Sequence, residues 1–99
     1  MIINKQVAQI VTEDLKEIAF WYNRQSKGLG MLFLKEISTE VSKITKNPLA
    51  YEVRYAAIRI AFIKKFPYGI HFEYLEKEEQ VNILAVFHTS QNPESWQNL

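Results

Sequence analysis

Residues 58–96 read IRIAFIKKFPYGIHFEYLEKEEQVNILAVFHTSQNPESW, and this stretch decides the fold. Within residues 58–63 the side chains alternate in character, which is the period-2 pattern of a strand with one buried face. The same alternation returns in residues 68–75. Residues 81–87 are apolar at almost every position, as expected of an inner strand that is covered on both sides. The stretch therefore predicts three consecutive antiparallel strands followed by a polar tail.

Two amphipathic helices are predicted before this sheet. The first begins between residues 8 and 12 and is broken at Gly28 and Gly30. The second runs over about residues 29–45 and ends at Asn47-Pro48, because a residue before proline disfavours the helical conformation. Helices joined by so short a turn form an antiparallel hairpin. The apolar stripes are Val11, Leu15, Ile18 and Tyr22 in the first helix, and Phe33, Ile37, Val41 and Ile44 in the second.

The predicted elements make a single domain over residues 1–99. The chain is 47% hydrophobic and 23% charged, which is typical of an ordinary globular protein that can bury a core. Residues 2–8 are expected to form a first strand at a sheet edge, and the stripes of both helices need one common apolar surface. The predicted fold is therefore α+β, with an N-terminal strand and an antiparallel helix hairpin packed on one face of a C-terminal antiparallel β-meander.

Composition and charge exclude several classes of protein. The chain has no cysteine, which excludes a disulfide framework and a thiolate metal site, and with two histidines no metal or cofactor is expected. No apolar run has the length of a signal-peptide core or a membrane span, so we expect a cytoplasmic protein without a membrane partner. A net charge of +1 and a pI near 8.0 are too close to neutral for a protein whose main partner is bulk nucleic acid.

Charge is unevenly distributed along the predicted sheet. Between residues 54 and 72 every charged residue is basic, and acidic residues then dominate residues 73–79. Two solvated turns of opposite sign would produce this pattern. A basic lip that meets an acidic partner would produce it as well. The basic residues are Arg54, Arg59, Lys64 and Lys65, and the acidic residues are Glu73, Glu76, Glu78 and Glu79.

The register between the first two strands of the meander decides which side chains share the face that the helices leave open. With residues 65–67 as the loop, Ile60 pairs with Phe72, which keeps the apolar faces together. A shift by one residue would place Ile60 opposite His71 and bury an imidazole, so the first register is expected and His71 is expected to be exposed. The open surface predicted from this register is shared by Arg59, His71, Glu73 and His88.

Several residues have both a structural and a functional interpretation. Arg59 opposite Glu73 would form a cross-strand ion pair worth under about 1 kcal/mol, or contact a phosphate or a partner. His88 would either donate a hydrogen bond to the backbone of the tail or act as a general acid–base or partner-binding group. Trp96 would either pack back on the sheet or anchor a partner. The predicted partner-binding residues are Arg59, Lys64, Lys65, His71, Gln91 and Trp96.

Taken in order along nearly the whole chain, these elements resemble the RelE/ParE superfamily, the toxin halves of type II toxin–antitoxin, or plasmid stabilization, systems. The resemblance rests on the helices EDLKEIAFWYNRQ and GLGMLFLKEI, the Phe66-Pro67-Tyr68 turn and the ending HTSQNPESW at residues 88–96. It implies a cytosolic toxin that inhibits growth and is neutralised by a small antitoxin. The antitoxin of such systems is usually a DNA-binding dimer whose disordered C-terminal arm folds on the toxin.

Members of the superfamily act in one of two ways. The RelE-like branch cleaves mRNA on the ribosome and needs acid–base groups and cations beside the scissile phosphate. Here Gly69 and Gln91 occupy positions where that branch often has arginine, which leaves Arg59 and His88 as candidate catalytic residues. The ParE-like branch inhibits DNA gyrase without being an enzyme. The features that favour it are the Trp21-Tyr22 pair, the Gly28-Leu29-Gly30 turn and the Phe66-Pro67-Tyr68 turn. The departure at Gln91 leaves open a third possibility, a non-toxic protein that keeps only antitoxin binding.

Overall fold

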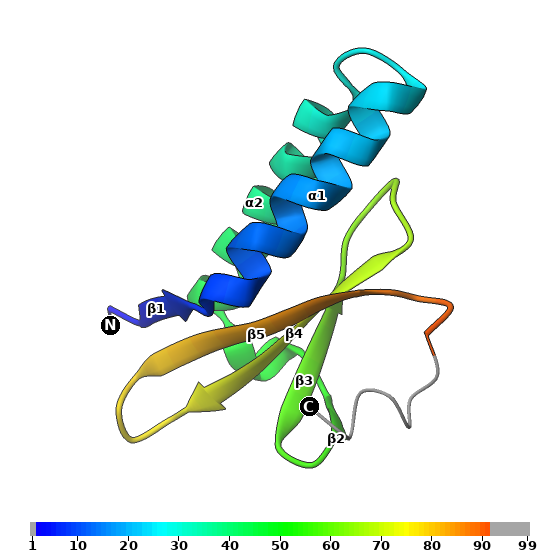
Figure 1. Ribbon diagram of the computed structural model, residues 1–99. Helices are drawn as coiled ribbons and strands as arrows, with labels where there is room; N and C mark the ends of the chain where they lie inside the picture. The colour runs from blue at the N-terminus through cyan, green and yellow to red at the C-terminus, as the bar shows by residue number, and fades with distance from the viewer. Residues whose placement is uncertain (1, 92–99) are drawn as a thin grey trace.

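The computed structural model of the chain describes residues 2–91 (Figure 1). A strand comes first, then two helices joined by a tight turn, a single 3-10 turn and four further strands. The predicted order of elements is confirmed, and one short strand at residues 53–55 is added before the predicted three. The elements are β1 (Asn4–Val7), α1 (Gln9–Gln25), α2 (Leu29–Lys46), η1 (Pro48–Ala50), β2 (Val53–Tyr55), β3 (Ile58–Phe62), β4 (Tyr68–Leu75) and β5 (Gln80–His88).

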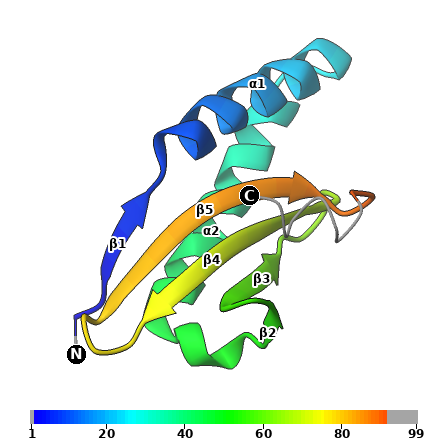
Figure 2. The same ribbon diagram turned by 60° about the horizontal axis from the view of Figure 1, so that its bottom comes forward.

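The strands form one mixed sheet in the order β1-β5-β4-β3-β2. Strands β2, β3, β4 and β5 pair with one another in antiparallel fashion. Strand β1 pairs in parallel with the other edge of β5. Both helices lie on one face of the curved sheet (Figure 2). The predicted α+β fold and the edge position of the first strand are therefore confirmed, and the parallel pairing of β1 is an added feature.

The core lies between the helix hairpin and the sheet. Val11 of α1 and both Phe33 and Ile44 of α2 are at most 1% exposed, and the rest of the two predicted stripes packs against the same cluster. Full burial of one such side chain contributes roughly 1.5–3 kcal/mol. Within the described residues, no helix is long and apolar enough to cross a membrane.

Two positions where the helices meet need a glycine, one in the turn just before α2 and one in the first turn of α2. Gly28 has a φ of 86°, a left-handed conformation that most side chains disfavour. Gly30 packs so closely on α1 that a Cβ there would lie 2.2 Å from the carbonyl oxygen of Ala19. The backbone N–H of Gly30 also donates a hydrogen bond of 2.8 Å to Oδ1 of Asn23. The second glycine therefore fixes the distance between α1 and α2.

The predicted register between β3 and β4 is wrong by one residue. Ile60 pairs with His71 and Phe62 with Gly69, which is the register that was not expected because it buries an imidazole. The cause is the loop, which closes through a hydrogen bond from the Ile63 N–H to the Tyr68 carbonyl and so contains four residues. Its third residue, Phe66, turns inward and joins the core.

The corrected register changes which side chains of β3 face the helices. Ala61 and Ile63 belong to the core cluster between helices and sheet, together with Ile70 of β4. Ile60 is buried on the opposite face, beside His71, and Phe62 is 46% exposed. The open face of the sheet is therefore more apolar than predicted.

Candidate functional site

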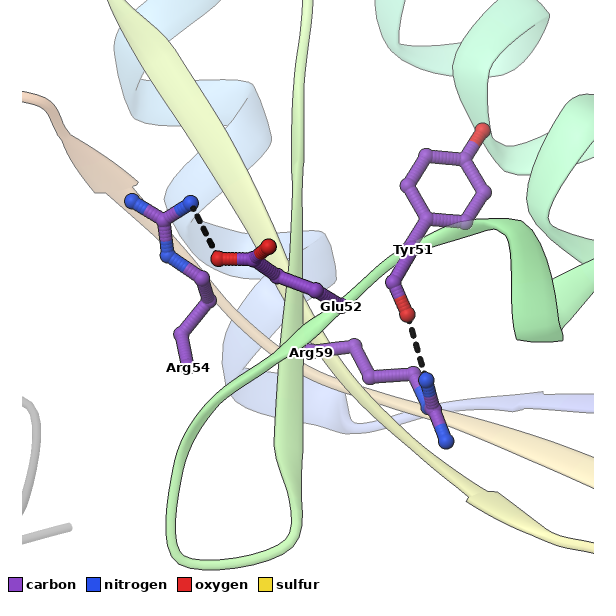
Figure 3. A network of polar contacts seen from close by, with 4 residues as sticks. All are labelled: Tyr51, Glu52, Arg54 and Arg59. Atoms are coloured by element: carbon purple, nitrogen blue, oxygen red, sulfur yellow. Dashed lines mark hydrogen bonds and ion pairs between the residues drawn. The ribbon is translucent and has the colours of Figure 1, made fainter.

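Arg59 lies on the helix side of the sheet. It pairs with Phe72, whose side chain is buried in the core beneath the helices. One guanidinium nitrogen, Nη1, donates a hydrogen bond to the backbone carbonyl of Tyr51 (Figure 3). The predicted ion pair with Glu73 does not form, because Glu73 follows Phe72 on β4 and therefore lies on the opposite face of the sheet. There it accepts a hydrogen bond of 2.9 Å from Asn82. Arg59 therefore ties the segment after η1 to the sheet.

The neighbouring charges are also used locally. Arg54 forms an exposed ion pair of 3.2 Å with Glu52 (Figure 3), and its guanidinium lies 5.7 Å from the centre of the Phe62 ring. An exposed pair of this kind contributes under about 1 kcal/mol. Of the four residues of the predicted basic lip, the two arginines thus both contact the segment just before β2, at Tyr51 and Glu52.

His71 is buried, which contradicts its predicted exposure. Only 1% of the residue is accessible. Its Nδ1 lies 2.9 Å from the hydroxyl of Tyr55, and its ring packs edge-on against Phe87 at 4.9 Å between centroids. Burial lowers the pKa of His71 to about 4, so the imidazole is neutral at neutral pH. A buried neutral ring is not available to a partner in this conformation.

His88 lies on the helix side at the end of β5, with its ring 5.2 Å from that of Tyr68. Its Nδ1 accepts a hydrogen bond of 3.0 Å from the backbone N–H of Ser90 and lies 2.8 Å from the Ser90 hydroxyl. A backbone N–H can only donate, so Nδ1 carries no proton and Nε2 is the protonated nitrogen. The expected hydrogen bond between His88 and the tail backbone is present in the opposite direction, because Nδ1 accepts where the ring was expected to donate.

The open surface predicted for Arg59, His71, Glu73 and His88 does not exist. Arg59 and His88 face the helices, whereas His71 lies on the opposite face. On β4 the partners of Arg59 and His88 are Phe72 and Tyr68, four residues apart, which corresponds to roughly 13 Å along the strand. The structure does not bring the candidate catalytic residues together.

The remaining predicted partner-binding residues are accessible where the structure describes them. Lys64 is exposed, and Nζ of the exposed Lys65 lies 3.8 Å from a carboxylate oxygen of Glu36. Gln91 is exposed, and its backbone N–H donates a hydrogen bond of 3.0 Å to the carbonyl of His88. Trp96 lies outside the described residues. Lys64, Lys65 and Gln91 therefore remain candidates for contact with a partner.

One open pocket of about 430 Å³ was not anticipated from the sequence. It lies between α1 and the adjoining ends of β4 and β5. The spacing of Glu17 and Trp21, one helical turn apart, only weakly indicates a shared site in the sequence. Tyr68 and His88 come beside them only in the folded chain. The lining residues are Glu17, Ile18, Trp21, Tyr22, Tyr68 and His88, and we refer to this site as the aromatic pocket.

A second cavity of about 420 Å³ opens between the helix hairpin and the sheet near β1. Its lining is mostly aliphatic and includes Val7, Val11, Leu15, Ile37 and Val41. Such a surface suits apolar side chains better than a polar substrate. Across residues 2–91 no three His, Asp or Glu side chains are grouped so that they could hold a metal ion.

Comparison with known proteins gives one family. The family described as the ParE toxin of the type II toxin–antitoxin system parDE matches residues 6–93 of the chain. No curated protein sequence matches. Among solved structures, the chromosomal ParDE toxin–antitoxin system from P. aeruginosa has a similar fold. That likeness has a TM-score of 0.78 at 12% identity and covers 90% of this chain and 98% of the other.

Two solved structures from E. coli are similar as well. The intact RelBE toxin–antitoxin complex has a TM-score of 0.66 at 9% identity, over 91% of this chain and 99% of the other. The isolated RelE toxin has a TM-score of 0.66 at 8% identity, over 97% of this chain and 94% of the other. At these identities the likeness concerns the fold.

Proposed function

Because the chain belongs to the family of ParE toxins of type II toxin–antitoxin systems, we propose that it inhibits growth by binding DNA gyrase in the cytoplasm. In this proposal the protein acts by binding, without catalysing a reaction. A cognate antitoxin, a small DNA-binding protein with a disordered C-terminal arm, holds it inactive.

We favour gyrase over mRNA as the proposed target because Arg59 and His88 are far apart. An RNA-cleaving site needs a general acid or base within hydrogen-bonding reach of the same phosphate that its cations contact. The two residues are roughly 13 Å apart along β4, and each is already hydrogen-bonded within the chain. This arrangement supports a mode of action that requires no catalytic group.

The cavity near β1 supports the antitoxin part of the proposal. An amphipathic arm that folds on the toxin would insert apolar side chains between the helix hairpin and the sheet. All four residues of β1 are exposed, and β1 forms one edge of the sheet, so an extended part of the arm has backbone groups to pair with.

A supercoiling assay with purified gyrase tests the proposed target. We expect micromolar toxin to inhibit supercoiling and the cognate antitoxin to restore it. The Arg59→Ala and His88→Ala variants should still inhibit, because neither residue is proposed to act on a substrate. Full gyrase activity in the presence of folded toxin would contradict the proposal.

A ribosome-dependent mRNA endonuclease is the second candidate, and the similarity of the fold to the isolated RelE toxin favours keeping it. Primer extension on translated messages after induction would show codon-linked cuts that disappear in His88→Ala. The third hypothesis is a non-toxic protein that keeps only antitoxin binding. Growth arrest on expressing the chain without its antitoxin would exclude that hypothesis.

A further inference from the structure

The aromatic pocket presents acceptor groups that nothing in the described chain uses. Glu17 forms no ion pair with any residue from 2 to 91, where the salt bridges are Arg54–Glu52 and Lys65–Glu36. The hydroxyls of Tyr22 and Tyr68 have no hydrogen-bonding partner in the same part of the chain. A carboxylate and two phenol oxygens are therefore available to a donor that enters.

The pocket walls also suit a cation. Trp21 is 54% exposed, and its indole meets the Tyr22 ring edge-on at 5.0 Å between centroids. The rings of Tyr22 and Tyr68 lie 6.5 Å apart between centroids. Burial, with a smaller contribution from Tyr22, raises the pKa of Tyr68, so its hydroxyl stays protonated. Aromatic faces attract cations, and a carboxylate beside them adds a charge-assisted hydrogen bond.

We propose that the aromatic pocket binds the guanidinium group of an arginine side chain carried by a partner polypeptide. A guanidinium is planar and can lie on the exposed face of Trp21. It also carries five N–H donors, enough for the carboxylate of Glu17 and the hydroxyl oxygens of Tyr22 and Tyr68 at once. A lysine ammonium has the charge but lacks the flat face, so arginine fits better.

An unpaired stretch of strand edge lies next to the pocket and can hold the rest of the partner segment. The pairing of β1 with β5 ends at Ile83, after which the Ala8 N–H donates to the Ile83 carbonyl. Strand β5 continues to His88, which lines the pocket. Among the described residues no strand pairs with this outer edge of residues 84–88. An extended segment added there would present every second side chain to one face.

A peptide titration tests the inference directly and does not depend on the gyrase proposal. The probe is acetyl-Thr-Arg-Thr-amide, and its control replaces arginine with citrulline, which has nearly the same shape and no charge. We expect the arginine peptide to shift the Trp21 indole N–H signal in NMR spectra saturably, and the citrulline peptide to bind at least about tenfold more weakly. The indole signal is assigned from the Trp21→Phe variant. Equal binding of both peptides, or no saturable shift, would overturn the proposal.

Two variants of α1 separate a specific site from a general charge effect. Glu17→Gln should weaken binding of the arginine peptide about tenfold, because it removes the proposed charged acceptor. Glu13→Gln removes the same charge from an exposed residue outside the pocket and should leave binding unchanged. Both positions are on the surface of α1, so thermal unfolding should confirm that both variants fold. Identical affinities of the two variants would overturn the role of Glu17 and with it the proposed site.

Discussion

Ile60 and His71 lie directly opposite each other across β3 and β4. Both are buried on the face of the sheet that points away from the helices, at 5% and 1% exposure. The polar ring is accommodated there because the hydroxyl of Tyr55 lies 2.9 Å from its Nδ1. A paired imidazole can be buried without the full penalty of an unsatisfied polar group.

The burial of His71 predicts that the protein loses stability on acidification. Its pKa is lowered from 6.5 to about 4 in the folded protein, so below pH 6.5 the unfolded chain binds the proton more strongly. The free energy of unfolding therefore rises with pH between about pH 4 and pH 6.5. Above that window the contribution of the neutral imidazole to stability is complete. Going from pH 7 to pH 4.5 should cost roughly 2 kcal/mol. Urea titrations at several pH values measure this cost, and the His71→Gln variant should show a flatter dependence by the same amount.

Gly30→Ala should destabilise the fold more than Gly28→Ala. A Cβ at Gly30 would collide with the backbone of Ala19, and separating the helices should cost about 3 kcal/mol. At Gly28 a Cβ would meet nothing within 4 Å, and only the left-handed backbone opposes it, at a cost of about 1 kcal/mol. Chemical denaturation of the two variants compares these costs. Similar losses at both positions would argue against the close helix contact.

Tyr51→Phe should cost about 2 kcal/mol, because the tyrosine hydroxyl donates a 2.7 Å hydrogen bond to the buried carboxylate of Glu40. Burial, together with that carboxylate, raises the pKa of Tyr51, which keeps the hydroxyl protonated as a donor. Tyr74→Phe is the matched control, since Tyr74 also packs against the core but its hydroxyl has no partner within residues 2–91. Urea unfolding at neutral pH should leave this control within about 0.5 kcal/mol of the native protein.

Reversing the charges of the β3–β4 turn should weaken the proposed inhibition of gyrase. Lys64 and Lys65 are the exposed members of the predicted basic lip that lie in this turn. The double variant Lys64→Glu/Lys65→Glu should raise the toxin concentration needed for half-inhibition about tenfold at low salt, and less at high salt. Lys77→Glu, in the β4–β5 turn, changes charge at another exposed site and should have little effect. An equal effect of both variants would assign the change to net charge alone.

The order and packing of the elements could be predicted because each depends on local signals. The stripe from Val11 to Tyr22 has helical spacing, and the Asn47-Pro48 step ends α2 at Lys46. These signals act within a few residues of the feature they specify. The face of β4 was also predicted correctly, since both Ile70 and Phe72 are fully buried in the core.

The register of β3 could not be predicted because it depends on one loop. Lys65 adopts a φ of 71° there, a conformation uncommon for a residue with a side chain, and this lets Phe66 turn into the core. One more loop residue moves Arg59 from the open face to the helix side and buries His71. The aromatic pocket escaped prediction for a related reason, since its walls come from segments that only the finished fold brings together.

The position of β5 has a consequence for when the fold is completed. This strand is the last of the five in the chain, yet it lies between β1 and β4, and Asn4 pairs with Gln80 across most of the sequence. While the chain is being translated, β1 has no neighbour to join and the helix hairpin lacks part of the surface that it covers. Contacts between residues so distant in sequence also form late in folding. A ribosome making this protein therefore carries an unfinished fold until residues 80–88 have emerged.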